Sequence, residues 1–380
     1  MQRVARQLYA ALAEIGAEPQ AVVYDPYAKR WRGPDAAELA LLAPTAAENP
    51  AQNRREVWSL AQKARGYLRL GVEPDWARLR GAPLLAPEIF SPAIFTAYAE
   101  LRRILAGPAA AIFHDAVALR LPEFTPPASI ARTEDYLREL ATFNGIAANS
   151  VASQVDLLEQ WARLGALFHP PSTAIPLGVS APPIPPQPLS QGETRLGALV
   201  LCVGSIEGRK NHRALLEAAE LLWSEGRHFR LILAGLPRRE TAAGALALAA
   251  RLQSAGRPLQ LTGAIPDQRL EELYAKCRFT VYPSLYEGYG LPVAESLLRL
   301  RPCICGTGGA LEEVAAGGGC LIVDEPDAPS LAQAMRTLLD DDTLLAQLAT
   351  EAAQRQFPTW NDYAHQLVAW LETLPKRAGR

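Results

Sequence analysis

The sequence predicts two doubly wound α/β domains joined by a proline-rich connector, and three observations support this fold class. Short apolar runs typical of buried parallel strands alternate with helical segments in both halves of the chain. Residues 181–192 read APPIPPQPLSQG, and their prolines lack the backbone donors that a sheet requires. Glycine-containing loops follow two of the apolar runs in the second half, as expected where a strand leads into a helix.

These features divide the chain into four parts. We expect a Rossmann-like domain over residues 1–181, a linker over 182–192, a second Rossmann-like domain over 193–356, and a helix and tail over 357–380. The terminal helix could pack back on the first domain. A length of 380 residues is ample for two buried cores.

The first domain shows the weaker strand pattern. Residues 1–16 place Val4, Leu8, Ala11, Leu12 and Ile15 on one helical face. Strands are expected at 21–24, 83–86, 109–113, 145–148 and 174–177, and helices near 54–69, 94–105, 130–141 and 151–164. Chains of this class normally open on a strand and its glycine loop. The opening helix therefore indicates that this strand is absent or lies upstream of Met1.

The second domain has six strand candidates with helices between them. The strands are expected at 198–203, 229–234, 259–262, 279–282, 302–305 and 320–323. The helices are expected near 211–224, 240–254, 267–275, 292–298, 310–315, 327–339 and 343–356. Thr359 should cap a last helix over 360–374.

The composition is typical of a globular protein and favours a small or neutral ligand. Apolar residues make up 49% and charged residues 21%, and a net charge of −2 predicts no general affinity for nucleic acid. The five cysteines lie in apolar runs of the second half, which favours reduced, buried thiols. No run approaches the roughly 20 apolar residues of a membrane-spanning helix. We expect a cytoplasmic protein, with peripheral contact at the inner face of the membrane left open.

A cluster of three acids, Asp340, Asp341 and Asp342, lies between two of the predicted helices. Metal binding is conceivable there, but capping of the helix junction by solvated carboxylates is the interpretation we favour. No Cys and His set completes a metal site near Cys303 and Cys305 either. The sequence therefore predicts no bound metal.

A strand, a glycine loop and a helix form the most informative stretch, residues 279–296 (FTVYPSLYEGYGLPVAES). Gly288 and Gly290 let backbone amides approach a ligand, and the helix begun by Pro292 directs its free N–H groups to the same place. Glu287 lies on the loop and Glu295 in the helix. Since a carboxylate repels phosphate, both acids are expected to accept hydrogen bonds from neutral hydroxyls. A nucleotide sugar fits, although such turns and acids also occur without a ligand.

Residues 203–212 (VGSIEGRKNH) form a second candidate loop. Gly204 and Gly208 follow a buried strand, and Arg209 and Lys210 stand at the start of a helix. Cations at a helix N-terminus oppose its dipole, and a bound diphosphate would explain them. An ordinary solvated basic pair is the alternative.

These two loops, with LILAG (231–235) and LTGAIPDQRLEELY (261–274), resemble the retaining, group 1 (family 4) glycosyltransferases of the GT-B fold. Glu287 and Glu295 match the E-x7-E signature of that family. The first domain matches more thinly, through QRVARQLYAAL, FHDAV and residues 175–178. The resemblance implies two Rossmann-like domains that face each other across a cleft.

The resemblance also implies roles for individual residues. Arg209 and Lys210 would neutralise the donor diphosphate as it leaves, Glu287 would contact the donor sugar, and Glu295 would hold the ribose hydroxyls. Further donor contacts would come from Gly204, from the base-binding loop Gly263, Ala264 and Ile265, and from the backbone of Gly288, Tyr289, Gly290 and Leu291. Ser205 stands where some branches of the family carry an arginine, so Arg209 and Lys210 alone would face the diphosphate.

His114 follows a predicted strand of the first domain and matches a family position that contacts the transferred sugar. A histidine at a strand end is also often a satisfied polar group, so both interpretations stand. Ser150 and Ser153 fall in a family-like stretch, but capping of the next helix explains them.

We therefore expect a metal-independent hexosyltransferase. It would move a sugar with retention from a nucleotide diphosphate-sugar donor to a hydroxyl of a glycan or lipid-linked acceptor, in synthesis of surface polysaccharide or glycoconjugate. The donor is a substrate, and no other cofactor is expected. A nucleotide-sugar epimerase and a non-catalytic nucleotide-sugar-binding protein remain alternatives. Released diphosphate without an acceptor requirement, or donor binding without turnover, would distinguish them.

Overall fold

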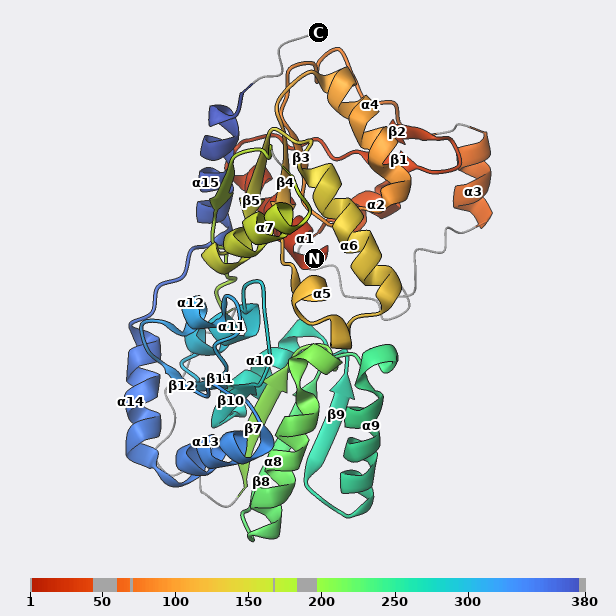
Figure 1. Cartoon of the computed structure of the whole chain (residues 1–380). Helices are drawn as coiled ribbons and strands as arrows, with labels where there is room; N and C mark the ends of the chain where they lie inside the picture. The colour runs from red at the N-terminus through yellow and green to blue at the C-terminus, as the bar shows by residue number, and fades with distance from the viewer. Residues whose placement is uncertain (1, 44–59, 69–70, 167, 183–196, 376–380) are drawn as a thin grey trace. The chain divides into compact units, whose positions relative to one another are not determined.

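The computed structural model describes residues 2–43, 60–68, 71–166, 168–182 and 197–375. The chain divides into two compact units (Figure 1). Unit 1 comprises Met1–Ala116, Pro127–Gly178 and Pro358–Arg380, and unit 2 comprises Val117–Pro126 and Val179–Phe357. Residues 117–126 thus group with the second unit, which the sequence does not indicate. Most of the predicted linker, residues 183–192, lies outside the described residues.

Unit 2 contains a fully parallel sheet of six strands in the order β12-β11-β10-β7-β8-β9. The strands are β7 (Ala198–Val203), β8 (Phe229–Ala234), β9 (Leu259–Gly263), β10 (Phe279–Tyr282), β11 (Cys303–Cys305) and β12 (Cys320–Ile322). The strand order reverses between β7 and β10. In an open α/β sheet, ligands bind at such a switch point, outside the carboxyl ends of the strands.

Helices cover both faces of this sheet. They are α8 (His212–Ser224), α9 (Arg239–Ser254), α10 (Asp267–Lys276), α11 (Leu291–Leu298), α12 (Leu311–Ala315), α13 (Ala328–Asp340) and α14 (Asp342–Ala353), with a short 3₁₀ helix η3 (Gly208–Lys210). Residues of α8, α9 and α13 pack with Val200, Leu231 and Ile304 in one core cluster. Leu199, Leu201 and Ile232 point to the other face, where α10 packs. Figure 1 shows α8 and α13 side by side.

Unit 1 contains a smaller parallel sheet of four strands in the order β3-β4-β5-β6. These are β3 (Leu84–Ala86), β4 (Ala109–Phe113), β5 (Gly145–Ala148) and β6 (Ser172–Ala174). Its α-helices are α1 (Gln2–Glu14), α2 (Ala36–Ala40), α3 (Leu60–Tyr67), α4 (Phe95–Leu105), α6 (Pro127–Leu140), α7 (Val151–Arg163) and α15 (Trp360–Thr373), and η1 (Pro92–Ile94) precedes α4. The segments α5 (Val117–Arg120) and η2 (Pro122–Phe124) group with unit 2.

The terminal helix α15 belongs to unit 1 and packs against α1 (Figure 1). This is the return to the first domain that the sequence allowed. Thr359 caps it: its hydroxyl accepts from the Asp362 N–H, and the Asp362 side chain accepts from the Thr359 N–H. Val4, Leu8 and Ala11 form the buried face of α1. The first and last helices of the chain therefore cover the same unit.

Two predicted strands of unit 1 differ from the structure. The strand expected at 21–24 is β1 (Val23–Asp25), which pairs antiparallel with β2 (Arg30–Arg32) outside the parallel sheet. Asp25 closes the turn between them by accepting from the N–H groups of Tyr27 and Ala28. The segment expected at 174–177 pairs earlier, over β6, because Pro176 has no N–H with which to extend the ladder. Of the helix expected near 54–69, residues 54–59 and 69 lie outside the described residues.

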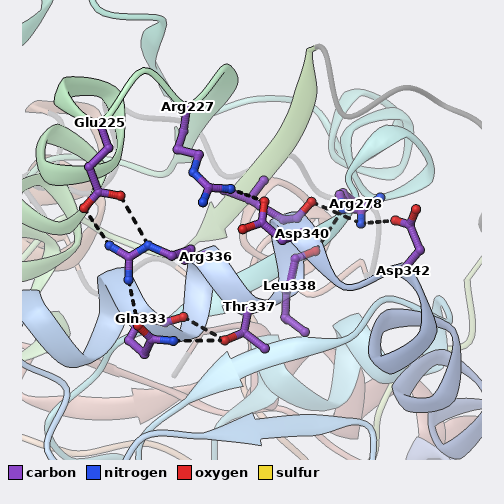
Figure 2. A network of polar contacts seen from close by, with 10 residues as sticks. Glu225, Arg227, Arg278, Gln333, Arg336, Thr337, Leu338, Asp340 and Asp342 are labelled. Atoms are coloured by element: carbon purple, nitrogen blue, oxygen red, sulfur yellow. Dashed lines mark hydrogen bonds and ion pairs between the residues drawn. The ribbon is translucent and has the colours of Figure 1, made fainter.

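The three acids at 340–342 stabilise a helix junction, as predicted. Asp341 is the N-cap of α14, and its side chain accepts from the Leu344 N–H at 2.9 Å. Figure 2 shows that Asp340 pairs with Arg227 and Asp342 with Arg278, while Arg336 on α13 meets Glu225 beyond the end of α8. Each carboxylate thus faces a cation or an amide.

The described residues also bear on membrane crossing and on the state of the cysteines. None of their helices is both long enough and apolar enough to cross a membrane. All five cysteines are free thiols, and four of them are buried.

Candidate functional site

The two loops singled out by the sequence meet at the switch point of the sheet in unit 2. One loop follows β7 and the other follows β10, and these strands are neighbours. The Leu285 N–H donates to the Arg209 carbonyl at 2.9 Å, which joins the loops through their backbones. The fold therefore holds residues 204–212 next to residues 283–290.

Gly204 makes room for Lys210. Its φ of +139° lies in a region that side-chain-bearing residues rarely adopt. A Cβ atom at this position would lie 2.9 Å from the Lys210 Nζ. The backbone conformation therefore favours glycine here, and a side chain at this position would displace the Lys210 ammonium from the carboxyl end of β7.

A buried carboxylate, that of Glu287, lies at the centre of the joined loops. Its Oε1 is 2.8 Å from the Arg209 Nη1 and 3.8 Å from the Lys210 Nζ. The same oxygen accepts hydrogen bonds from the Tyr282 hydroxyl at 2.8 Å and the Ser284 hydroxyl at 2.6 Å. Its backbone is also fixed, because the Glu287 N–H donates to Gly308 and the Glu287 carbonyl accepts from Ala310.

The surroundings of Glu287 keep it ionised. Burial alone would raise its pKa, but the charges of Lys210 and Arg209 and the hydrogen bonds from Ser284 and Arg209 outweigh burial and lower the pKa to about 2. The carboxylate thus carries a full negative charge at neutral pH. It can accept hydrogen bonds but cannot act as a proton donor there.

The cluster balances its charges internally. Arg209 also pairs with Glu207, through a contact of 2.9 Å between Nη2 and Oε1. Two cations, Arg209 and Lys210, therefore face two anions, Glu207 and Glu287. An anionic ligand would be held here by directed N–H donors, which must exchange carboxylate partners for the ligand, and not by excess positive charge.

The α11 helix supplies further donors beside the cluster. Gly290 is its N-cap with φ of +100°, and Pro292 lies in its first turn, as predicted. The first N–H groups of a helix have no partner within the helix and carry the positive end of its dipole. The backbone next to Glu287 thus leads directly into the N-terminus of α11, through Gly288, Tyr289, Gly290 and Leu291.

Glu295 occupies a different setting from Glu287. It lies in α11, is only 3% exposed, and its backbone carbonyl accepts from the Arg299 Nη1. Burial raises the pKa of Tyr274, and the neighbouring Glu295 carboxylate adds to this effect. The predicted partner of ribose hydroxyls is therefore a buried carboxylate in the second turn of α11.

The loop predicted to hold the base lies two strands from β7. Gly263 ends β9 and forms an isolated bridge with Gly235. Gly235 in turn lies against Gly204, since a Cβ added to it would be 1.9 Å from the Gly204 carbonyl oxygen. Gly263, Ala264 and Ile265 are thus connected to the cluster at the same edge of the sheet.

His114 belongs to unit 1, directly after β4. It is 5% exposed, and its Nε2 lies 2.8 Å from the Pro87 carbonyl oxygen. Because a carbonyl only accepts, Nε2 carries the proton and Nδ1 has a lone pair. Burial lowers the His114 pKa to about 4, so the ring is neutral at neutral pH. Nearby, Ser150 caps α7, as predicted, and the Ser153 hydroxyl donates to the His114 carbonyl.

Sequence reasoning missed three members of the cluster. Tyr282 and Ser284 donate to Glu287, and Glu207 pairs with Arg209. Ser284 precedes Glu287 by three residues, a spacing typical of local side-chain contacts in loops. Tyr282 could be recognised only once β10 was placed beside β7.

No group of three or more Cys, His, Asp or Glu side chains that could hold a metal ion occurs among the described residues. This finding agrees with the acid triplet at 340–342 being occupied by helix capping and ion pairs.

Solved structures of other proteins share this architecture. A glucose- and UDP-bound structure of HepE from Anabaena aligns with a TM-score of 0.60 at 18% identity, covering 76% of this chain and 78% of that one. Sucrose-phosphate synthase from Thermosynechococcus elongatus aligns with a TM-score of 0.59 at 20% identity, covering 76% and 73%. The fold is GT-B, with two Rossmann-like domains.

Sequence comparisons show the family. Residues 197–341 match the family described as glycosyl transferases group 1. O-antigen chain mannosyltransferase B of Escherichia coli is 31% identical over 268 residues, which cover 67% of this chain and 68% of that protein. Serotype-specific mannosyltransferase WbdA of Escherichia coli is 30% identical over 177 residues, 46% of this chain but only 22% of that protein. The chain belongs to the group 1 glycosyltransferases.

Proposed function

We propose that this glycosyltransferase moves a hexosyl residue, mannose being the first candidate, from a nucleotide diphosphate-sugar to a hydroxyl of a glycan or lipid-linked acceptor. The choice of mannose follows the names of its relatives, the mannosyltransferase B and WbdA of Escherichia coli. The same names support a place in O-antigen or other surface polysaccharide synthesis.

One observation carries this proposal. Arg209, Lys210 and Glu287 meet beside the N-terminus of α11 at the switch point of unit 2. Two cations and a helix N-terminus suit a diphosphate, and an ionised carboxylate suits the hydroxyls of a sugar. A nucleotide diphosphate-sugar contains both chemical groups.

In the proposed reaction the bond between the anomeric carbon and the diphosphate oxygen breaks, and an acceptor oxygen bonds to that carbon from the same face. Because the new bond forms on the face that the diphosphate leaves, the configuration is retained. The acceptor proton passes to the leaving diphosphate. Arg209 and Lys210 stabilise the charge that develops on the leaving group. Glu287 would contact the sugar, Glu295 the ribose, and the loop of Gly263, Ala264 and Ile265 the base.

Replacing Lys210 should strongly reduce turnover and preserve the fold. Lys210→Ala removes a charge that stabilises the leaving group, so the initial rate with GDP-mannose or UDP-glucose should fall by about a hundredfold. Lys276→Ala is the control, because Lys276 is exposed at the end of α10. Turnover is measured by the release of nucleoside diphosphate, and the fold by circular dichroism. An unchanged rate in folded Lys210→Ala would refute the proposal.

The same assay tests the roles of metal and acceptor. Full activity in EDTA is expected, since the N–H donors of Arg209 and Lys210 would stabilise the leaving diphosphate. A strict Mg²⁺ requirement would contradict metal independence. The anomeric coupling in the NMR spectrum of the product tests retention. Donor binding without release of nucleoside diphosphate would instead identify a non-catalytic binding protein.

A further inference from the structure

We propose that Tyr282 is a positioning residue of the donor site, and that its hydroxyl holds the Glu287 carboxylate and the Lys210 ammonium in their working geometry. This inference rests on the proposed function. It assigns a role to a residue that neither the sequence motifs nor the family signature single out.

The Tyr282 hydroxyl lies between the two charged groups. It donates to the Glu287 Oε1 at 2.8 Å and accepts from the Lys210 Nζ at 3.0 Å. The direct separation of the Lys210 Nζ and the Glu287 Oε1 is longer, 3.8 Å. The phenol thus bridges a cation and an anion that do not form a close hydrogen bond with each other.

The position of Tyr282 is well fixed. It is the last residue of β10, where it pairs with Cys305 of β11, and it is only 3% exposed. The Lys210 ammonium also lies 5.1 Å from the centre of the Tyr282 ring, within the range of a cation–π contact. Burial and the nearby Glu287 carboxylate raise the pKa of the phenol, so it keeps its proton and can donate and accept at once.

The hydrogen bonds on Glu287 are arranged asymmetrically. Tyr282 and Ser284 both donate to Oε1. One oxygen is therefore anchored by the protein. The other can accept from a sugar hydroxyl, with its direction fixed by the anchoring of the first.

Tyr282→Phe isolates the hydroxyl, because the ring and its contact with Lys210 are retained. We expect kcat to fall by about tenfold with a KM for the donor within about twofold, since misplacing a group that acts in the transition state lowers kcat. Tyr363→Phe is the matched control. Tyr363 is a buried tyrosine of α15 whose hydroxyl has no hydrogen-bond partner among the described residues.

A double-mutant cycle separates positioning from general stability. If Tyr282 acts through Glu287, Tyr282→Phe should lower the single-turnover rate by about tenfold in the wild-type background and by less than about twofold in a Glu287→Gln background. Equal losses in both backgrounds would overturn the inference. A Tyr282→Phe protein that is fully active, or that does not fold, would also overturn it. A wild-type protein with no donor turnover would instead refute the proposed function, and this inference with it.

Discussion

At the scale of the residue, the site is governed by the competition between burial and charge. Glu287 is buried yet ionised, because Arg209, Lys210 and two hydroxyl groups stabilise its negative charge. Burial lowers the pKa of His114 to about 4, so its ring is neutral. These protonation states differ because burial disfavours the charged form unless a partner compensates for it.

The neutral His114 predicts a dependence of stability on pH. Its pKa is about 4 in the folded protein against an ordinary value of 6.5, so the unfolded chain binds the proton first as pH falls. The free energy of unfolding should therefore decrease from about pH 6.5 to pH 4. His114→Gln keeps an N–H donor for Pro87 but does not titrate. Urea denaturation measures the free energy of unfolding at pH 7 and at pH 5. The decrease between these pH values should be smaller for His114→Gln than for the wild type, by on the order of 2 kcal/mol.

His212 does not disturb this comparison, although burial also lowers its pKa to about 4. It is present in both proteins, so the difference between them isolates His114. Equal losses for wild type and His114→Gln would contradict the neutral, buried state of His114.

At the scale of the element, strand ends position the site. Arg209 and Lys210 follow β7 in a 3₁₀ turn, and Glu287 follows β10 before α11. The strands are held by parallel pairing, while the loops are joined by the hydrogen bond from Leu285 to Arg209. The chemistry therefore depends on a short connection between two rigid strands.

The capping box of α15 allows a test at the same scale. Thr359→Ala removes the hydroxyl that accepts from the Asp362 N–H, so the free energy of unfolding should fall by about 1 kcal/mol. Thr350→Ala is the control, because Thr350 is exposed inside α14 and caps nothing. The measurement is the free energy of unfolding of unit 1 from chemical denaturation, because α15 packs on α1 in that unit. Equal stability of Thr359→Ala and wild type would contradict the role of this cap.

The sequence was most informative where local signals were strong. In the second domain, apolar runs predicted β7, β8 and β10 with their observed bounds. In the first domain, β1 was placed in the wrong kind of pairing, because a short apolar run does not reveal its partner. The same limit explains Tyr282: its contacts with Lys210 and Glu287 depend on which strands are neighbours, and this is a long-range property.

At the scale of the whole molecule, the chain is a group 1 glycosyltransferase with two Rossmann-like units. The donor residues carried over from the family resemblance all lie in unit 2, and His114 lies in unit 1. The first and last helices both belong to unit 1, so the chain leaves this unit and returns to it. We expect the donor to be bound mainly by unit 2 and the acceptor to be selected by unit 1.

The most direct test is a crystal structure of the protein with a bound donor. GDP-mannose and UDP-glucose would first be compared by thermal shift, since a ligand that binds only the folded state raises the melting temperature. The donor giving the larger shift would be used for crystallisation. The predicted result is a diphosphate in contact with Arg209, Lys210 and the N-terminus of α11, with a sugar hydroxyl on Glu287. A diphosphate bound elsewhere, with these side chains still paired to one another, would contradict the account.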